Sequence, residues 1–359
     1  MNIIKQILCA MAGAWMLTSA FAETYYQTSP DDSNNAPTYG KSSVYDIARW
    51  NTEYNGSGNT PTSPPNTAIG PEVHNYYITD RLLRTRLNSD DNNIFYADSL
   101  TVNYLNADSK IFFKGQADTT LTFTGSLILN DGVALDQNTG SSGSTNGLTQ
   151  TLIATAIQVN GTVTIRQSQG LNGNVDQQTN KMVIDAPFTG GGTLLITNAI
   201  INTSFHLTLQ GDNHDYTGNV TINNTNPTTA TLARATTLII EAGSNLGTGI
   251  ITLGKGSTLT LNYADALALN SGLVIGDTIS KINLTSNATY LQSYKMLDGE
   301  VYDLTNALNQ TIGSASLGAN IVDERITGGL FIIAAIPEPS TWLLLSVGTG
   351  LLIFLRRRK

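Results

Sequence analysis

Residues 157–165 read Ile-Gln-Val-Asn-Gly-Thr-Val-Thr-Ile, with apolar side chains at alternate positions on both sides of Gly161. By itself, Asn160-Gly161 is typical of a two-residue hairpin turn. A tight turn there would make the apolar positions before it and after it face opposite ways. A strand that runs through Gly161 with a bend keeps all four apolar positions on one face, and glycine is the residue expected at such a bend. We therefore predict bent strands that stack in parallel, not a hairpin meander.

The same pattern returns at residues 121–129, which read Leu-Thr-Phe-Thr-Gly-Ser-Leu-Ile-Leu. Short runs of Thr, Val, Ile and Leu, separated by Gly and Asn, fill the chain from about residue 94 to residue 335 and indicate strands and turns. Residues 263–270 are only a weak helix candidate, and residues 81–87 fit a short helix, a strand or a loop equally. The fold class predicted is all-β. Residues 262–335 are expected to continue the β structure, although no motif sets their topology.

A series of motifs follows in residues 188–261. A Gly-rich apolar run at 188–196 precedes Leu209, Gly211, Asn213, Tyr216 and Gly218, and then Leu246, Gly247 and Gly249. This succession resembles the autotransporter-associated β-strand repeat, with Asn245 where that repeat usually has a small residue. The resemblance implies a right-handed parallel β-helix, a solenoid that buries a column of Val, Ile and Leu and leaves its loops outside.

The stretch before the repeats has a different composition. Nine of the 14 tyrosines and Trp50 precede residue 105, together with several prolines. We predict a Tyr-rich N-terminal cap with loops over residues 23–93 and the β-solenoid over residues 94–335. Four aromatic residues fit two roles, because their rings suit either a platform that stacks on sugars or a cap that closes the open end of the solenoid. These residues are Trp50, Tyr54, Tyr76 and Tyr77.

The N-terminal residues 1–22 indicate a secretory signal peptide. Lys5 supplies the positive start, Ile7 to Leu17 the apolar centre, and Ala20-Phe21-Ala22 a small-x-small cleavage site. A lipid anchor on Cys9, the single cysteine, fits poorly, because Gln6-Ile7-Leu8 precedes it where a small residue would be expected next to the cysteine. Once this segment is removed, the mature chain offers no disulfide and no Cys-based metal site.

The C-terminal end, residues 336–359, has three parts in order. Pro337-Glu338-Pro339 is followed by an apolar run at 340–355 and then by Arg356, Arg357, Arg358 and Lys359. As a helix, the apolar run would be about 24 Å long, which is short but workable for a membrane span. The four cations favour a cytoplasmic position for the end of the chain, and the two prolines keep the preceding stretch extended.

This arrangement resembles the PEP-CTERM sorting tail, which an exosortase, a membrane transpeptidase-like enzyme, recognises. The resemblance implies a Gram-negative bacterium, transient residence in the inner membrane, and final residence on the cell surface or in the extracellular exopolysaccharide matrix. A plain C-terminal membrane anchor is the alternative, although such an anchor does not need Pro-Glu-Pro.

Charge and motifs exclude several other functions. The chain has 27 Asp and Glu against 19 Lys and Arg, and four of those cations lie at the extreme C-terminus, so no surface for nucleic acid is expected. Neither a Gly-x-Ser-x-Gly elbow nor a phosphate-binding loop is present in the sequence. His206 and His214 lack a third zinc ligand at a useful spacing.

Two acidic clusters remain as candidates for chemistry. Asp212-Asn213-His214-Asp215 places two carboxylates and an imidazole close together, as a glycoside hydrolase would need, but it lies in the polar loop of the repeat and fits turn residues. Asp90-Asp91-Asn92-Asn93 could coordinate calcium, or could be a solvated turn whose charge Arg81, Arg84 and Arg86 balance. We expect no catalytic residue, no metal and no cofactor.

Together these features predict a secreted, exosortase-sorted structural or adhesin-like component of the cell surface or exopolysaccharide matrix. The alternative is a carbohydrate-binding or polysaccharide-degrading β-helix protein.

Overall fold

The computed structural model of the chain describes residues 22–27, 50–53, 57–61, 74–79, 82–87, 93–105, 110–115, 118–139, 148–169, 178–200, 203–224, 236–262, 267, 272–276, 279–285, 288–289, 293–295, 301–303 and 310–332. In these ranges the secondary structure is β strand, apart from one short 3-10 helix, η5 (Ala315–Leu317). The all-β prediction is confirmed.

Three sheets, which we call A, B and C, form the body. Sheet A contains β1 (Thr24–Gln27), β2 (Trp50–Asn51), β3 (Asn75–Ile78), β6 (Ser99–Val102), β9 (Ser126–Leu129), β12 (Ala156–Val159) and β15 (Phe188–Thr189). Sheet B contains β4 (Leu82–Leu87), β7 (Lys110–Gly115), β10 (Ala134–Thr139), β13 (Thr162–Gln169), β16 (Thr193–Asn198), β18 (Val220–Asn224), β20 (Ile250–Leu253), β22 (Gly272–Ile275), β25 (Ser293–Lys295) and β26 (Val301–Asp303). Sheet C contains β5 (Ile94–Phe95), β8 (Thr119–Phe123), β11 (Thr149–Ile153), β14 (Gln178–Asp185), β17 (Thr203–Leu209), β19 (Thr236–Ile240), β21 (Ser257–Leu261), β23 (Lys281–Leu284) and β29 (Ile326–Thr327).

A fourth sheet, the end sheet, closes the series. It contains β24 (Ala288–Thr289), β27 (Thr311–Gly313), β28 (Ile321–Val322) and β30 (Phe331–Ile332). Residues 262–335 therefore do continue the β structure where they are described, with β22, β23, β25, β26 and β29 in sheets B and C and the other strands in this separate sheet.

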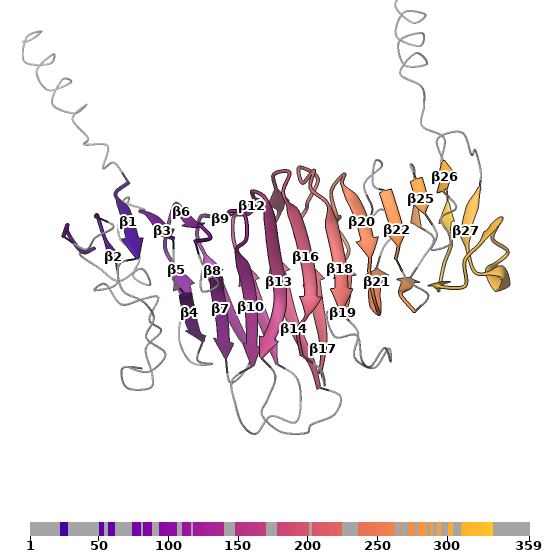
Figure 1. Cartoon of the computed structure of the whole chain (residues 1–359), viewed down its shortest axis with the longest axis horizontal. Coiled ribbons are helices and arrows are strands. Elements are labelled where there is room, and N and C mark those ends of the chain that lie inside the picture. Colours follow the sequence, from indigo (N-terminus) through magenta and orange to yellow (C-terminus); the bar gives the residue numbers. More distant parts are fainter. Residues whose placement is uncertain are drawn as a thin grey trace, which may run out of the picture.

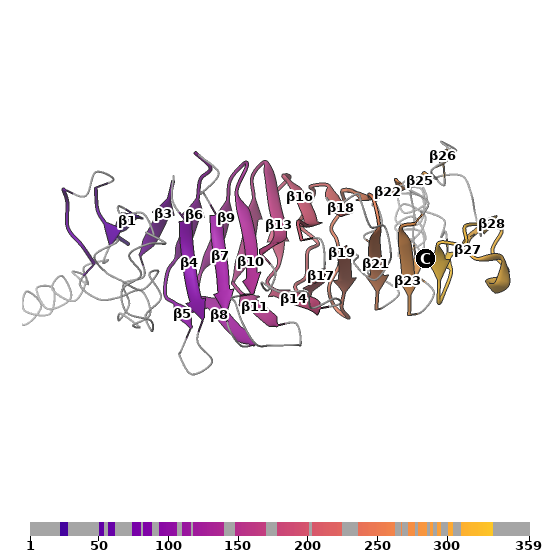
Figure 2. The ribbon, with the colours of Figure 1, turned by 60° about the horizontal axis from the view of Figure 1, so that its bottom comes forward.

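The chain visits the sheets in turn, so that β6, β7 and β8 belong to A, B and C, and β9, β10 and β11 repeat the cycle. Nearly all pairings within a sheet are parallel and join strands of successive coils. After β15, the place of sheet A is held by an isolated bridge between Gly190 and Tyr216. Figures 1 and 2 show the strands of each sheet side by side along the long axis. The predicted parallel β-solenoid is confirmed; its right-handed sense stays a prediction.

In-register apolar columns form the core. One column of sheet B has a single apolar residue on each of eight successive strands: Leu83, Ile111, Leu135, Ile165, Ile196, Ile222, Leu253 and Ile275. All are buried. Because side chains alternate along a strand, a strand whose pairing shifted by one residue would turn its apolar side chains from the core toward solvent. The hydrophobic effect therefore sets the register of the solenoid.

The stretch around Gly161 keeps its four apolar residues on the inner face, as predicted, since Ile157, Val159, Val163 and Ile165 are all buried. However, it is not one bent strand. It consists of β12 in sheet A and β13 in sheet B, and Gly161 lies at the corner between them with φ +88°. Residues 121–129 turn at a different corner, from β8 in sheet C to β9 in sheet A. The two runs share a pattern without being equivalent parts of successive coils.

A column of glycines lines the corner between sheets A and B. A Cβ on Gly192 would lie 2.2 Å from the carbonyl oxygen of Gly161, one on Gly218 would lie 1.6 Å from that of Gly192, and one on Gly249 would lie 1.9 Å from that of Gly218. Real Cβ atoms do not approach oxygen so closely, so only glycine permits each coil to stack on the one before. This explains the glycine at 218 and at 249 in the repeat motifs.

The solenoid begins earlier than residue 94. Strand β3 pairs in parallel with β6, and β4 with β7, so residues placed in the predicted cap already belong to sheets A and B. Residues 82–87 are a strand, which decides among the three interpretations left open for that stretch.

Aromatic side chains close the core at this end. Trp50 lies on β2, which pairs antiparallel with β1 at the edge of sheet A. Its ring centroid is 4.7 Å from that of Tyr76, which in turn is 5.0 Å from that of Phe95. All three side chains are fully buried. This packing is what a cap on the open end of a solenoid requires.

Polar side chains replace apolar ones inside the corner between sheets B and C. Gln137, Gln167 and Asn198 occupy one in-register column and are buried. The Gln137 amide donates to the carbonyl of Lys181 at 2.7 Å, and the Asn198 amide donates to that of Thr203 at 2.5 Å. These amides on sheet B therefore bond main-chain carbonyls of sheet C across the corner.

Candidate functional site

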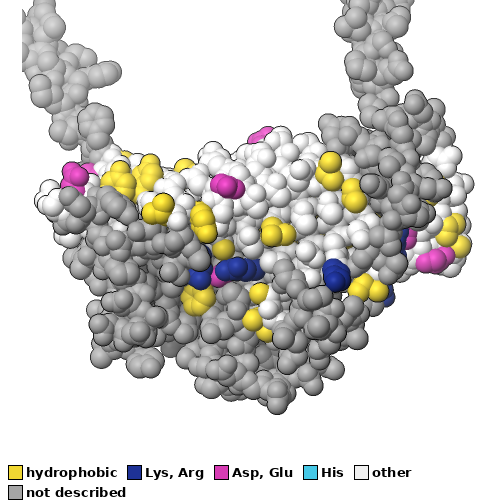
Figure 3. Space-filling model, in the orientation of Figure 1, with side chains coloured by type: hydrophobic (Ala, Val, Ile, Leu, Met, Phe, Trp, Pro, Cys, Tyr) yellow, Lys and Arg dark blue, Asp and Glu magenta, His cyan; other side chains and the backbone are white. Residues whose placement is uncertain are grey.

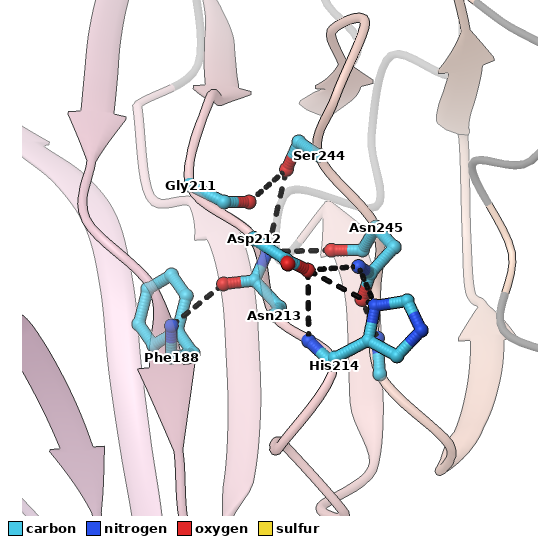
Figure 4. A network of polar contacts seen from close by, with 8 residues as sticks. Phe188, Gly211, Asp212, Asn213, His214, Ser244 and Asn245 are labelled. Atoms are coloured by element: carbon cyan, nitrogen blue, oxygen red, sulfur yellow. Dashed lines mark hydrogen bonds and ion pairs between the residues drawn. The ribbon is translucent and has the colours of Figure 1, made fainter.

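The cluster at residues 212–215 lies on the loop that follows β17, and it faces the loop that follows β19 in the next coil. Figure 4 shows Asp212, Asn213 and His214 beside Ser244 and Asn245, although the two loops are 31 to 33 residues apart in the chain. The sequence predicted turn residues here. The structure adds that these side chains join successive coils.

Asn213 is the buried centre of this arrangement, with 1% of its surface exposed. Its Oδ1 accepts a hydrogen bond from the backbone N–H of Phe188 at 2.6 Å, and its Nδ2 donates to the carbonyl of Asn245 at 2.5 Å. Ser244 donates to the carbonyl of Gly211, also at 2.5 Å. The side chain of Asn213 therefore satisfies main-chain groups of the coil before and of the coil after its own. Losing these hydrogen bonds would be costly, because the groups would be left unpaired in a buried position.

The titratable part of the cluster lies outside this buried centre. The Nδ1 of His214 is 3.0 Å from Oδ1 of Asp212, and the side chains of these two residues are 79% and 66% exposed. The amide of Asn245 donates to the same Asp212 oxygen at 2.6 Å. The hydrogen bond with His214 is the main reason that the pKa of the Asp212 carboxyl is lowered. Asp215 points into solvent as well.

This geometry offers little for catalysis. A carboxylate that orients an imidazole supplies two of the three members of a nucleophilic triad, but in the described ranges no hydroxyl or thiol bonds to the other ring nitrogen of His214. The pair is also open to water, so it lacks the desolvation that separates the pKa values of an acid and a base. The arrangement fits a surface link between coils better than a reaction centre.

His206 does not join this cluster. It lies on β17, on the outer face of sheet C, in register with Lys181 of the neighbouring strand. Burial and then the nearby Lys181 lower the pKa of its imidazole. In the part of the chain that the structure describes, no group of three His, Cys, Asp or Glu side chains could hold a metal ion.

The calcium alternative for residues 90–93 cannot be placed, because only Asn93 is described. Its side chain is buried, and its carbonyl accepts a hydrogen bond from the N–H of Thr122. Arg81 lies outside the described residues. Arg84 and Arg86 lie on β4, in register with Phe112 and Lys114.

The sequence did not single out an ion cluster on the outer face of sheet B. Asp136 is fully buried there, and Arg166 of the next strand forms two hydrogen bonds to it, at 2.5 and 3.0 Å. Lys110 lies 3.8 Å from the same carboxylate on the other side. The hydrogen bond to Asp136 is the main cause of the raised pKa of Arg166. The three charges link β7, β10 and β13 across the ladder, and Figure 3 shows Lys and Arg side chains over these strands.

Of the four aromatic residues weighed as a sugar platform, two lie inside the core. Trp50 and Tyr76 are fully buried in the core, so neither presents a ring face to a sugar, and burial raises the pKa of the Tyr76 hydroxyl. Tyr77 is half-buried and packs on Tyr26 of the neighbouring strand, with ring centroids 5.4 Å apart. Tyr54 lies outside the described residues.

Both ends of the chain also lie outside the described residues. These include Ala20 of the predicted signal peptide, the Pro337-Glu338-Pro339 motif, the apolar run at 340–355 and the four terminal cations. No helix within the described ranges is long and apolar enough to cross a membrane.

We expect Asn213→Ala to lower the free energy of unfolding by about 2 kcal/mol or more, because the Phe188 N–H and the Asn245 carbonyl would lose their partner while buried. Chemical denaturation of the secreted chain measures the loss. Asp215→Ala, in the same loop but exposed, should change stability by less than about 0.5 kcal/mol. Similar losses in both variants would show that Asn213 does not link the coils in this way.

One family model matches the chain, that of the PEP-CTERM protein-sorting motif, at residues 335–359. The predicted sorting tail is therefore confirmed as a sequence motif. The chain has no match among curated proteins or solved structures. The resemblance of residues 188–261 to the autotransporter-associated β-strand repeat stays a prediction, although a parallel β-solenoid, which it implies, is observed.

Proposed function

We propose that this chain is a structural or adhesive component of the cell surface or exopolysaccharide matrix of a Gram-negative bacterium, and that it has no enzymatic activity. The PEP-CTERM motif at residues 335–359 points to a bacterial surface protein that an exosortase sorts. The body that this tail would deliver is a β-solenoid. The adhesive or matrix role is the part that we propose.

The observation that carries the proposal is the combination of that sorting motif with a stiff, elongated body. In-register columns and inter-coil hydrogen bonds hold successive coils together. Figure 1 shows the strands stacked along one long axis. Such a body supplies a long exposed surface and keeps its two ends apart, which suits a spacer or a matrix element. A signal peptide at residues 1–22, if processed, would begin the same export route.

Our proposal that the protein has no enzymatic activity rests on the solvent-exposed geometry of the Asp212–His214 pair. This pair is the strongest catalytic candidate in the described ranges. We expect purified wild-type protein to release no reducing ends from polysaccharides. Asp212→Asn and Asp215→Asn should alter only local stability, because neither carboxylate has a desolvated catalytic partner. A reducing-sugar assay run beside a glycan array checks this. Turnover of any polysaccharide by the wild type that either substitution abolishes would overturn the structural role.

The alternative, a carbohydrate-binding or polysaccharide-degrading protein, would be favoured by a different outcome of the same experiment. Selective binding on the array without release of reducing ends would indicate a binding role. The burial of Trp50 and Tyr76 argues against a platform made of the four predicted aromatic residues.

A further inference from the structure

The end sheet carries apolar side chains on its outer face. Three of the six exposed large hydrophobic residues in the described ranges lie within residues 317–332: Leu317, Val322 and Ile332, which are 43%, 47% and 40% exposed. Figure 3 shows hydrophobic side chains on the surface at that end, beside acidic ones.

Strand pairing places Val322 and Ile332 on the same face. Val322 is in register with Gly313 and Ile332 with Thr311, so both flank alternate residues of β27. The intervening residue, Ile312, pairs with Phe331 and Ile321 and is fully buried on the opposite, inner face. With two inter-strand steps and an offset of two residues along β27, the two positions are about 12 Å apart. Leu317 lies on η5, in the connection from β27 to β28.

The chain beyond this sheet brings the face close to a membrane. Seven residues, 333–339, separate Ile332 from the predicted span at 340–355, so the eight residue steps from Ile332 to Ser340 reach at most about 29 Å when fully extended. While the tail is inserted, the end sheet cannot move farther than this from the lipid surface. Among the described residues, none of the other exposed hydrophobic side chains, such as that of Leu105 after β6, is tethered in this way.

We propose, on the basis of the sorting function proposed above, that Leu317, Val322 and Ile332 form a lipid-contacting face that seats the end of the solenoid on the membrane surface before the tail is processed. Apolar side chains at such a surface gain free energy by entering the boundary between headgroups and acyl chains. Seating the sheet there would hold Pro337-Glu338-Pro339 at the membrane–water boundary, where a membrane enzyme would read it.

The chemistry of the face favours lipid over the other occupants. Three side chains bury far less area than the roughly 1,000 Å² that a stable protein interface needs, so a second copy would not be held by them alone. The charged groups beside the face are Glu324, which accepts a hydrogen bond from the N–H of Ala315, and Asp323, which pairs with Arg325. With no excess of positive charge, the contact does not depend on anionic lipids.

Spin labelling of the full, unprocessed chain tests the proposal. With Cys9→Ser as background, Val322→Cys, Ile332→Cys and the matched control Leu105→Cys each carry a nitroxide label in phosphatidylcholine vesicles that hold the tail. The accessibility of the label to oxygen relative to a water-soluble nickel chelate should be several-fold higher at 322 and at 332 than at 105. Because all three side chains are exposed, the substitutions should leave the fold intact.

A second variant tests the cause of the contact. In a chain labelled through Leu317→Cys, adding Val322→Glu and Ile332→Glu should lower the accessibility ratio to the value at residue 105, with an unchanged melting temperature. Equal accessibility ratios for the labels at residues 322, 332 and 105 would overturn the proposal. Labels at 322 and 332 that are shielded from both reagents would indicate a protein occupant, and would overturn it as well.

The vesicles contain no enzyme, so this experiment does not depend on whether an exosortase processes the tail. Water-exposed labels together with normal processing in cells would refute the lipid contact and leave the sorting function standing. Lipid-exposed labels together with no processing would leave a lipid contact on a plain membrane-anchored protein.

Discussion

Gly161→Val is expected to lower the free energy of unfolding of the secreted chain by about 3 kcal/mol, the largest stability effect anticipated for a single surface position. Gly161 has φ +88°, which a β-branched residue adopts only with strain. An added Cβ would also lie 2.5 Å from the Cβ of Asp131 in the preceding coil. Asp131 accepts a hydrogen bond from the N–H of Thr162, so shifting it would loosen the same corner. Denaturation by guanidinium chloride measures the loss.

Thr162→Val is the matched control, one residue away. The side chain of Thr162 is exposed, and its hydrogen bond to Asp131 is made by the backbone N–H, which valine retains. We expect a change below about 0.5 kcal/mol. If both variants lost the same stability, backbone strain at Gly161 and the contact with Asp131 would not be the cause of the loss.

The second large effect is on sorting. Glu338→Ala combined with Pro339→Ala should leave the protein as an unprocessed form in the inner membrane, with little or none released to the cell surface, because the enzyme would no longer recognise its motif. Membrane fractionation followed by immunoblotting measures the distribution. Export of the variant at the wild-type level would mean that Pro-Glu-Pro is not read.

Replacing Arg356 to Lys359 with neutral residues separates retention from recognition. If residues 340–355 span the membrane as predicted, the four cations would stop transfer of this segment, so their loss should weaken retention in the inner membrane while leaving Pro-Glu-Pro in place. An effect identical to that of the Glu338 and Pro339 changes would show that the two parts of the tail do not act separately.

The alternation of apolar residues was enough to predict the inner face of this solenoid. The apolar residues at alternate positions are all buried, as predicted: Ile157, Val159, Val163 and Ile165. This prediction succeeds because the identity of each residue shows directly whether its side chain belongs on the buried face. Which corner of the coil a run occupies is not a local property. Residues 121–129 and 157–165 carry the same alternation around a glycine, yet they turn between different pairs of sheets. Only pairing with strands about 30 residues away distinguishes them, as in the pairing of Leu127 with Ile157.

The roles of individual side chains could also be predicted only in part from the sequence. The repeat motif identified Asn213 as a position of interest, but its hydrogen bonds to Phe188 and Asn245 depend on stacking that no single coil contains. Composition showed that the N-terminal stretch is aromatic, but it does not tell whether a ring such as that of Trp50 faces the core or the solvent. The outer face of the end sheet gave no signal either, because Val322 and Ile332 look like any other apolar strand residues in the sequence.

The C-terminal mass of the mature protein tests the central claim most directly, since a processed sorting tail and a plain anchor predict different ends. Protein released from the surface of the producing cells would be purified intact, and its C-terminal peptides identified by mass spectrometry. A sorted protein should lack residues 342–359, so that no peptide from Trp342 onward is recovered. Recovery of the intact Arg-Arg-Arg-Lys terminus, residues 356–359, from mature protein would contradict sorting by an exosortase and leave a β-solenoid held by a simple membrane anchor.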